Sequence, residues 1–192
     1  MKSRLPYVIA GAVGALAISA APTLAQDAPC LFRGSQDEVA QRTSPPDSLT
    51  FELSGNTFKI CYGRPSARGR TMLGGRLPHG ALWRTGANEP TMIHASAPIS
   101  IAGVNVPAGT YSIYTVPGAS QWEIVVNRSY SQWGHEGQYT EAVQAQEAGR
   151  ATVPAESTDE HVEMFTIHFA DEHIVLEWEN TRVRIPVATY TM

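Results

Sequence analysis

Short runs of alternating apolar and polar residues follow one another along most of the chain. The run 49–53 reads LTFEL and the run 57–62 reads TFKICY, with the turn residues Ser54, Gly55 and Asn56 between them. Alternation with a period of two indicates β-strands with one buried face, and a short polar connection containing glycine is typical of a hairpin. The pattern therefore predicts a β-hairpin near the start of the folded part of the chain.

Runs of the same kind continue to the end of the sequence. They cover residues 91–96, 99–103, 109–118, 121–127, 150–154, 162–170, 173–179 and 182–188. Only residues 139–149 have a helical composition, with Gly149 as the expected end of the helix. Many short strands separated by turn residues predict an all-β fold. We expect a single-domain, jelly-roll-like β-sandwich with long loops and at most one short helix.

The same alternation predicts which side chains form the core. The expected core residues are Trp122, Phe165, Ile167, Phe169, Ile174, Leu176, Trp178, Val183, Ile185 and Val187. Glu177 and Glu179 fall on the face opposite Trp178, and Arg182 and Arg184 also point away from the core. If the last two strands pair, these four charged side chains form ion pairs across the strands.

The first 25 residues have the layout of a secretory signal peptide. A basic start precedes an apolar run over residues 8–21, and small residues at Thr23 and Ala25 predict cleavage after Ala25. The apolar run is shorter than the roughly 20 residues of a membrane-spanning helix. We expect a periplasmic or secreted protein without a membrane span after cleavage. The expected segments are residues 1–25 as the signal peptide, 26–44 as an N-terminal extension and 45–192 as the sandwich domain.

Cysteine content and net charge limit the possible environments and partners. In an oxidising compartment, Cys30 and Cys61, the two cysteines of the chain, are expected to form a disulfide. Removal of residues 1–25 takes away two basic residues and no acids, so the net charge changes from −4 to −6. An acidic protein is a poor partner for nucleic acids, and we expect none to bind.

The segment 62–91 is rich in arginine and glycine. Its five arginines precede the first acid, Glu89, and they are Arg64, Arg68, Arg70, Arg76 and Arg84. Guanidinium groups bind carboxylates and phosphates through paired hydrogen bonds, and the N–H groups of a glycine-rich loop also favour anions. The alternative is a structural network in which Arg84, Asn88 and Glu89 bond to one another and to Glu52 or Glu123.

Two loops add aromatic residues to this candidate site. Trp83 lies within the arginine-rich segment, and residues 129–139 form a second polar loop that contains Trp133. Loops gather at the ends of a sandwich, so the two segments are expected to meet and to bind an anionic small molecule, a glycan or a peptide. The alternative is that both tryptophans close one end of the core. The candidate ligand-binding residues are Arg64, Arg68, Arg70, Trp83, Arg84, Asn88, Glu89 and Trp133.

Patterns for other chemistry are weak. The six histidines form no His-x-His or His-x-x-x-His pair, and no Gly-x-Ser-x-Gly nucleophile motif is present. We therefore expect neither a metal site nor a cofactor, and the sequence does not assign catalytic residues or an oligomeric state. A hydrolase acting on an envelope carbohydrate stays as the alternative function, with Glu89 as its general acid or base.

Four segments of the chain resemble a known family. They are YGRPSARGRTMLGGRLPHGALWRTGANEPT (62–91), VPAGTYSIYTVPG (106–118), QWEIVVNRSYSQWG (121–134) and LEWENTRVRIPV (176–187). In this order they resemble the motifs of a family of secreted bacterial proteins classed as a domain of unknown function, number 2911, over residues 45–188. The resemblance implies an exported protein and no particular activity. With the arginine-rich segment, it favours a noncatalytic binding or structural module of the cell envelope.

Overall fold

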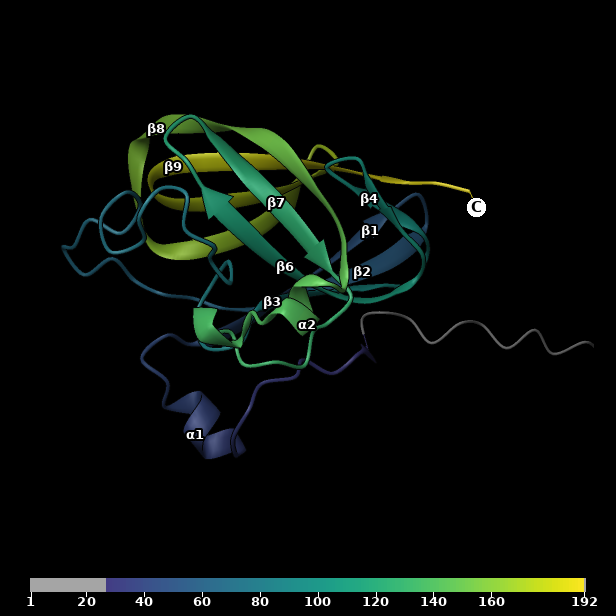
Figure 1. Cartoon of the computed structure of the whole chain (residues 1–192), viewed down its shortest axis with the longest axis horizontal. Coiled ribbons are helices and arrows are strands. Elements are labelled where there is room, and N and C mark those ends of the chain that lie inside the picture. Colours follow the sequence, from purple (N-terminus) through teal and green to yellow (C-terminus); the bar gives the residue numbers. More distant parts are fainter. Residues whose placement is uncertain (1–26, 192) are drawn as a thin grey trace, which may run out of the picture.

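A computed structural model describes residues 27–191, and the predicted signal peptide lies outside these residues. Strands dominate the fold, whereas the helices are short (Figure 1). The strands are β1 (Pro46–Leu53), β2 (Asn56–Gly63), β3 (Thr91–Ala95), β4 (Ile99–Ile101), β5 (Val104–Val106), β6 (Gly109–Pro117), β7 (Gln121–Asn127), β8 (Glu147–Ala170) and β9 (His173–Thr189). The helices are α1 (Gln36–Ala40), the 3-10 helix η2 (Glu136–Gln138) and α2 (Glu141–Gln144).

The strands form one antiparallel sheet in the order β1-β2-β3-β6-β7-β8-β9-β4-β5. The long strands β8 and β9 carry this sheet from one layer of the sandwich to the other. The first part of β8 pairs with β7, whereas its second part pairs with β9 and reaches the segment after β2, where Phe165 N donates to Pro65 O at 2.9 Å. The all-β sandwich is confirmed, and its strand order is simpler than a jelly roll because most neighbours are consecutive.

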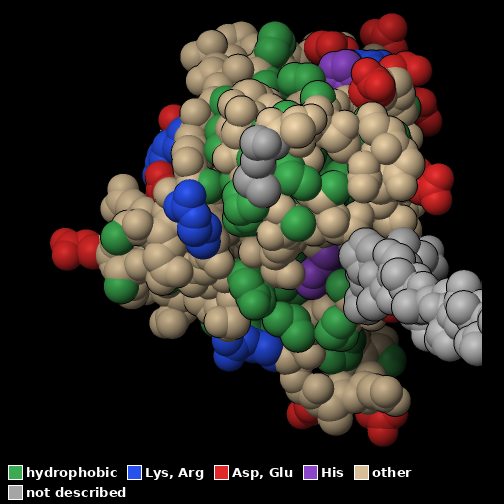
Figure 2. Space-filling view, turned by 90° about the vertical axis from the view of Figure 1, so that its right-hand side faces the viewer, with side chains coloured by type: hydrophobic (Ala, Val, Ile, Leu, Met, Phe, Trp, Pro, Cys, Tyr) green, Lys and Arg blue, Asp and Glu red, His purple; other side chains and the backbone are tan. Residues whose placement is uncertain are grey.

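The core lies between the two layers. Nearly all of the predicted core residues are buried, namely Trp122, Phe165, Ile167, Ile174, Leu176, Trp178, Val183, Ile185 and Val187. Phe169 is only partly buried, but its ring stacks on Phe51 of β1 with 4.2 Å between the centroids. Strand alternation therefore identified the apolar face correctly along β8 and β9. On the face of the molecule in Figure 2, acidic side chains lie mostly towards the periphery.

The two predicted strands at 173–179 and 182–188 are a single strand, β9, and this changes the expected ion pairs. Glu177 does pair with Arg182, with 2.6 Å between Oε1 and Nε, but both residues belong to β9. Arg184 faces Glu156 of β8 instead. Glu179 has a φ of 52° and accepts hydrogen bonds from two backbone N–H groups of the arginine-rich segment. The prediction that Glu179 forms an ion pair with one of the arginines at 182 and 184 was therefore wrong.

Residues 27–191 contain more helices than the single short helix that was expected at most. The helix predicted over 139–149 is limited to α2 and ends before Gly149, because Gly149 pairs with Val126 of β7 as part of β8. The second α-helix, α1, begins with a capping box in which Ser35 and Glu38 bond to each other's backbone N–H groups. No helix within residues 27–191 is long and apolar enough to cross a membrane.

Residues 27–44, the N-terminal strap, run across the sandwich before β1 begins. The predicted disulfide is present and joins Cys30 of the strap to Cys61 of β2, with 5.6 Å between the Cα atoms. Arg42 of the strap binds Glu89, and Ser44 O accepts a hydrogen bond from Asn88 at 3.5 Å. The strap is therefore attached to the segment that precedes β3 by polar contacts, while no residue of its helix α1 is buried.

Candidate ligand-binding site

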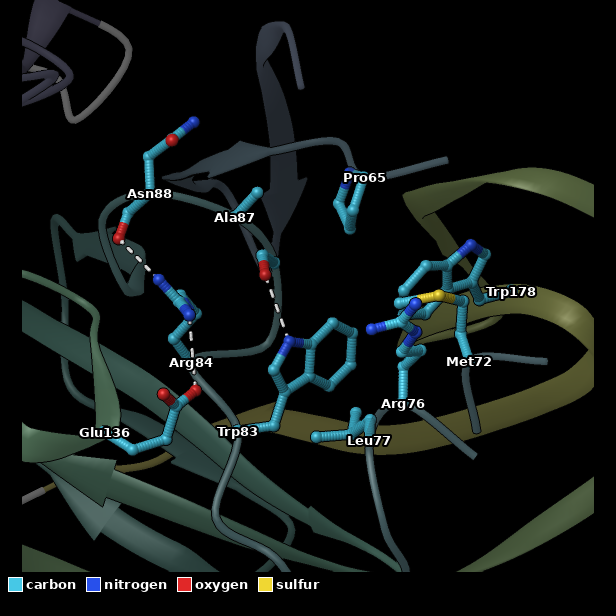
Figure 3. A pocket seen from close by; sticks show the side chains of 11 residues that line it. Pro65, Met72, Arg76, Leu77, Trp83, Arg84, Ala87, Asn88, Glu136 and Trp178 are labelled. Carbon is cyan, nitrogen blue, oxygen red and sulfur yellow. Dashed lines mark hydrogen bonds and ion pairs between the residues drawn. The ribbon is translucent and has the colours of Figure 1, made fainter. Parts of the chain in front are cut away.

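A cleft of about 350 Å³ opens between the arginine-rich segment and the bend of β9 (Figure 3). Most of its lining comes from residues 65–88, between β2 and β3, and Glu136 of η2 and Trp178 of β9 complete it. The lining residues are Pro65, Met72, Arg76, Leu77, Trp83, Arg84, Gly86, Ala87, Asn88, Glu136 and Trp178. The cleft thus joins a long loop, a short helix and a core strand.

Two arginines line this cleft, one on either side of Trp83 (Figure 3). In Figure 3, Arg76 lies beside Met72 and Trp178, and Arg84 lies on the other side of Trp83. Arg76 is exposed, and its side chain forms no hydrogen bond or ion pair with any residue in the range 27–191. With Glu136 as the one carboxylate in the lining, the charged side chains leave an excess of one positive charge. The cleft is therefore suited to an anionic group.

Arg84 is held at the edge of the cleft but is incompletely bonded. Its Nη1 donates to the carbonyl of Asn88 at 3.3 Å, and its Nη2 lies 3.2 Å from Oε1 of Glu136. Its Nε is buried and has no hydrogen-bond partner among the described residues. A buried donor without an acceptor is costly, so a small displacement of Arg84 towards an anionic ligand would recover a missing hydrogen bond.

The floor of the cleft is aromatic and belongs to the core. The rings of Trp83 and Trp178 are stacked with 5.4 Å between their centroids, and Phe165 meets Trp83 edge-on. Trp83 is only 5% exposed, and its Nε1 donates to Gly86 O at 3.0 Å. Trp83, a predicted ligand-binding residue, therefore offers no open ring face to a ligand, because core side chains already cover its ring. The alternative, that Trp83 closes the core, describes its position.

The loop between Trp83 and β3 has an unusual and well-supported backbone. Thr85 and Asn88 both adopt positive φ values, 56° and 66°, which non-glycine residues seldom do. The carbonyl of Thr85 accepts a hydrogen bond from Thr91 Oγ1 at 2.6 Å, and the Thr85 hydroxyl bonds to that of Thr115 at 3.1 Å. Such strained residues persist only where the surroundings impose them, and they occur often at binding sites.

Gly134 lies against this loop without space for a side chain. A Cβ atom there would stand 2.7 Å from Arg84 Cδ and 2.9 Å from the carbonyl carbon of Glu89. We expect Gly134→Ala to lower the free energy of unfolding by about 2 kcal/mol, because the backbone must move to relieve this contact. Urea denaturation measures the loss. Gly55→Ala is a poor control because its φ is positive, so Ala119→Gly, in an exposed turn, serves instead, and an equal loss in both variants would contradict the packing argument.

The loop that carries Glu136 is anchored to β6 by tyrosine contacts. Gln132 Nε2 donates to the hydroxyl of Tyr114 at 3.0 Å, and the ring of Tyr139 meets that of Tyr114 at 4.6 Å. Burial raises the pKa of Tyr114 above its ordinary value. Its hydroxyl therefore stays protonated at neutral pH and remains available to this network.

Three of the predicted binding arginines lie outside the cleft. Arg64 donates from Nη2 to Thr166 at 2.8 Å and pairs with Asp47, which ties β2 to β8 and β1. Arg68 donates to Thr43 O of the strap, and Arg70 donates to Ala67 O and Ser66 O within its own turn. The predicted convergence of these residues with Arg84 was wrong, because each guanidinium group is committed to a nearby acceptor.

Glu89 and Asn88 belong to a structural network, although its members differ from those expected. Both oxygens of Glu89 accept hydrogen bonds from Arg42 at 2.8 Å, and Oε1 also accepts from Arg33 N at 2.6 Å. The partners predicted for this network, Glu52 and Glu123, do not take part in these contacts. Asn88 lines the cleft, whereas Glu89 is buried beneath the strap, so the two neighbours face different surroundings.

Trp133 lies apart from the cleft. It is 36% exposed, and the guanidinium carbon of Arg33 lies 5.7 Å from its ring centroid. It therefore neither lines the cleft nor closes the core. Within the part of the chain that the structure describes, no group of three or more His, Cys, Asp or Glu side chains is arranged to hold a metal ion.

Sequence reasoning missed several residues of the cleft. Arg76 belongs to the arginine-rich segment but was not among the candidate ligand-binding residues, and Met72 and Leu77 carry no local signal beyond their apolar character. Glu136 is 52 residues from Arg84, so only the fold brings the two side chains together.

Comparison with known proteins agrees with the resemblance found in the sequence. A family model described as "Protein of unknown function (DUF2911)" matches residues 44–187. No curated protein and no solved structure matches the chain. The matched range starts at the end of the strap and ends in β9, and it includes every residue that lines the cleft. Because this range is about three quarters of its length, the chain belongs to the DUF2911 family.

Proposed function

We propose that this protein is a noncatalytic binding module of the cell envelope that holds an anionic group between Arg76 and Arg84. The observation that supports this best is the pair of arginines that line one cleft, one exposed without an ion pair among residues 27–191 and the other with a buried, unpartnered Nε. The ligand contributes a carboxylate or a phosphate, which guanidinium groups bind through paired, charge-assisted hydrogen bonds.

The rest of the cleft selects the body of the ligand. Met72 and Leu77 are half-buried, and Trp178 lines the cleft beside them. A volume of about 350 Å³ is within the range of pockets for small molecules. The ligand is therefore amphipathic, with a compact apolar part against these side chains and its anionic group at the arginines.

The carboxylates near the cleft favour a binding role over the alternative, a hydrolase, because each is already engaged in an ion pair. Glycoside hydrolysis uses two carboxyl groups on either side of the scissile bond. Glu136 is the one carboxylate that lines the cleft in residues 27–191, and it is paired with Arg84. Glu89, the residue predicted as a general acid or base, is buried and holds Arg42 of the strap. Its oxygens are thus used to anchor the strap.

The proposed location depends on the N-terminal sequence and on the disulfide. Residues 1–25 have the features of a secretory signal, and Cys30 is bonded to Cys61, as expected in an oxidising compartment. We therefore place the protein in the periplasm or outside the cell. N-terminal sequencing of the exported chain tests this, and a start other than Gln26 contradicts the proposed cleavage.

Titration calorimetry with 3-phenylpropionate, which joins an apolar ring to a carboxylate, tests the binding proposal. We expect saturable binding that Arg76→Ala weakens about tenfold, which corresponds to one lost charge-assisted hydrogen bond. Arg70→Ala is the matched control, since Arg70 is exposed in the same segment but does not line the cleft. No binding by the unaltered protein, or equal losses in both variants, would overturn the proposal.

A further inference from the structure

The exposed large hydrophobic side chains of the described residues gather at the strap. They are Leu31, Tyr130 and Trp133, with 41%, 37% and 36% exposure. Leu31 belongs to the strap, and the two aromatic residues belong to the loop between β7 and η2. A hollow of about 280 Å³ lies between these two segments, and its lining includes Leu31, Tyr130, Ser131 and Arg33. Exposed hydrophobic side chains that cluster in one place often mark interaction sites.

This strap surface, defined by Leu31, Arg33, Tyr130, Ser131 and Trp133, is held in place from several directions. The guanidinium group of Arg33 donates from Nη2 to the carbonyl of Ser131 and lies over the ring of Trp133. Its backbone N–H donates to the buried carboxylate of Glu89. The surface is therefore preorganised, which reduces the entropy that binding would cost.

Three polar side-chain groups of the strap surface form no hydrogen bond within the described residues. Among residues 27–191, the phenol of Tyr130, the indole N–H of Trp133 and the hydroxyl of Ser131 take part in no hydrogen bond with another side chain or with the backbone. Each therefore remains available to a bound molecule, next to an exposed aromatic ring. A ligand that fits offers apolar C–H faces to the rings and many hydroxyl groups to the polar atoms.

Charge further restricts the choice of ligand. Glu89 is the carboxylate in the lining of the hollow, and Arg42 already neutralises it. Arg33 forms no ion pair with a described residue, so its positive charge remains at the strap surface. Hydroxyl-rich rings with an accessible carboxylate are the chemistry of an acidic carbohydrate, and a guanidinium group suits that carboxylate.

We propose that the strap surface is a second binding site, separate from the cleft, which takes an acidic carbohydrate chain with one sugar ring against Tyr130 and Trp133 and a carboxylate at Arg33. The cleft and this surface lie on different sides of the loop that contains Asn88 and Glu89, since Asn88 lines the cleft and Glu89 lines the hollow. The second site does not depend on the proposed function of the cleft.

Tryptophan fluorescence tests this proposal because it reports on one residue. Trp83, Trp122 and Trp178 are at most 5% exposed, so quenching by acrylamide depends mainly on Trp133. With tetragalacturonate as the probe, we expect saturable protection from quenching, and weaker protection by the neutral cellotetraose. Absence of saturable protection by tetragalacturonate would overturn the proposal, and equal protection by both sugars would overturn the role of Arg33.

Substitutions in the two sites show whether the carbohydrate binds at the strap surface or in the cleft. By calorimetry, we expect Tyr130→Ala and Arg33→Gln each to weaken tetragalacturonate binding about tenfold, whereas Arg184→Ala, on the other layer, leaves it unchanged. Arg76→Ala, which alters the cleft, is also expected to leave it unchanged. Loss of binding in Arg76→Ala with retention in Tyr130→Ala would assign the sugar to the cleft and overturn the second site.

Discussion

Replacement of Arg42 by alanine is expected to lower the free energy of unfolding by about 3 kcal/mol. Arg42 and Glu89 form a two-point ion pair whose side chains are only 12% and 6% exposed. Removal of one member of a buried ion pair leaves the other charge without its partner in a poorly solvated site, which is strongly destabilising. Urea denaturation of the Arg42→Ala variant and of the unaltered protein at pH 7 measures the difference.

Two comparison variants make this prediction specific. Arg184→Ala removes a long, half-exposed ion pair with Glu156, so we expect a loss within about 0.5 kcal/mol. Adding Glu89→Gln to Arg42→Ala removes the stranded charge, so the double variant should be more stable than Arg42→Ala alone. If Arg42→Ala cost no more than Arg184→Ala, the strap would not depend on this pair for its attachment.

The fold was predictable wherever one face of a strand is buried. Alternation selected the apolar face of β8 and β9 correctly because the side-chain period of a strand does not depend on what the strand pairs with. It did not reveal that residues 173–188 are one strand. Within this strand Glu179 has a φ of 52°, and its carboxylate binds the N–H groups of Met72 and Leu73 more than 100 residues away. A local pattern contains no information about such a distant partner.

The candidate site was predictable as a segment but not residue by residue. The arginine-rich segment does form most of the cleft, yet Arg76 and Arg84 line it while Arg64, Arg68 and Arg70 do not. A loop has no fixed period, so the direction of each guanidinium group depends on its nearest acceptor. Some of these acceptors come from remote parts of the chain, such as Thr166 for Arg64, whereas those of Arg70 lie in its own turn.

The loop that contains Asn88 and Glu89 connects the cleft to the strap. The carbonyl of Asn88 accepts from Arg84 on the cleft side, while the carboxylate of Glu89 accepts from Arg42 and Arg33 on the strap side. Because adjacent residues hold the two sites, a shift of this loop would move both. The strap is thus part of the structural support of the cleft as well as a proposed binding surface.

Removal of the disulfide is expected to lower the free energy of unfolding by about 3.5 kcal/mol. Cys30 and Cys61 are 31 residues apart, and closing a loop of this length restricts the unfolded chain by about that amount. We expect the Cys30→Ala, Cys61→Ala double variant to show this loss in urea denaturation under non-reducing conditions. Alanine is preferred at position 61 because Cys61 is buried, and a hydroxyl there would need a partner.

Hydrogen exchange distinguishes the origin of this loss. The double variant retains the contacts of Glu89 with Arg42 and Arg33, so its strap should stay attached from Arg33 onwards and open mainly around residues 27–32. Faster amide exchange confined to those residues would support two independent anchors for the strap. Faster exchange throughout β2 would instead mean that loss of the buried sulfur atoms disturbs the core, and the chain-entropy account would then be wrong. The disulfide and the ion pair therefore make separable contributions, which Arg42→Ala in the double-alanine background measures directly.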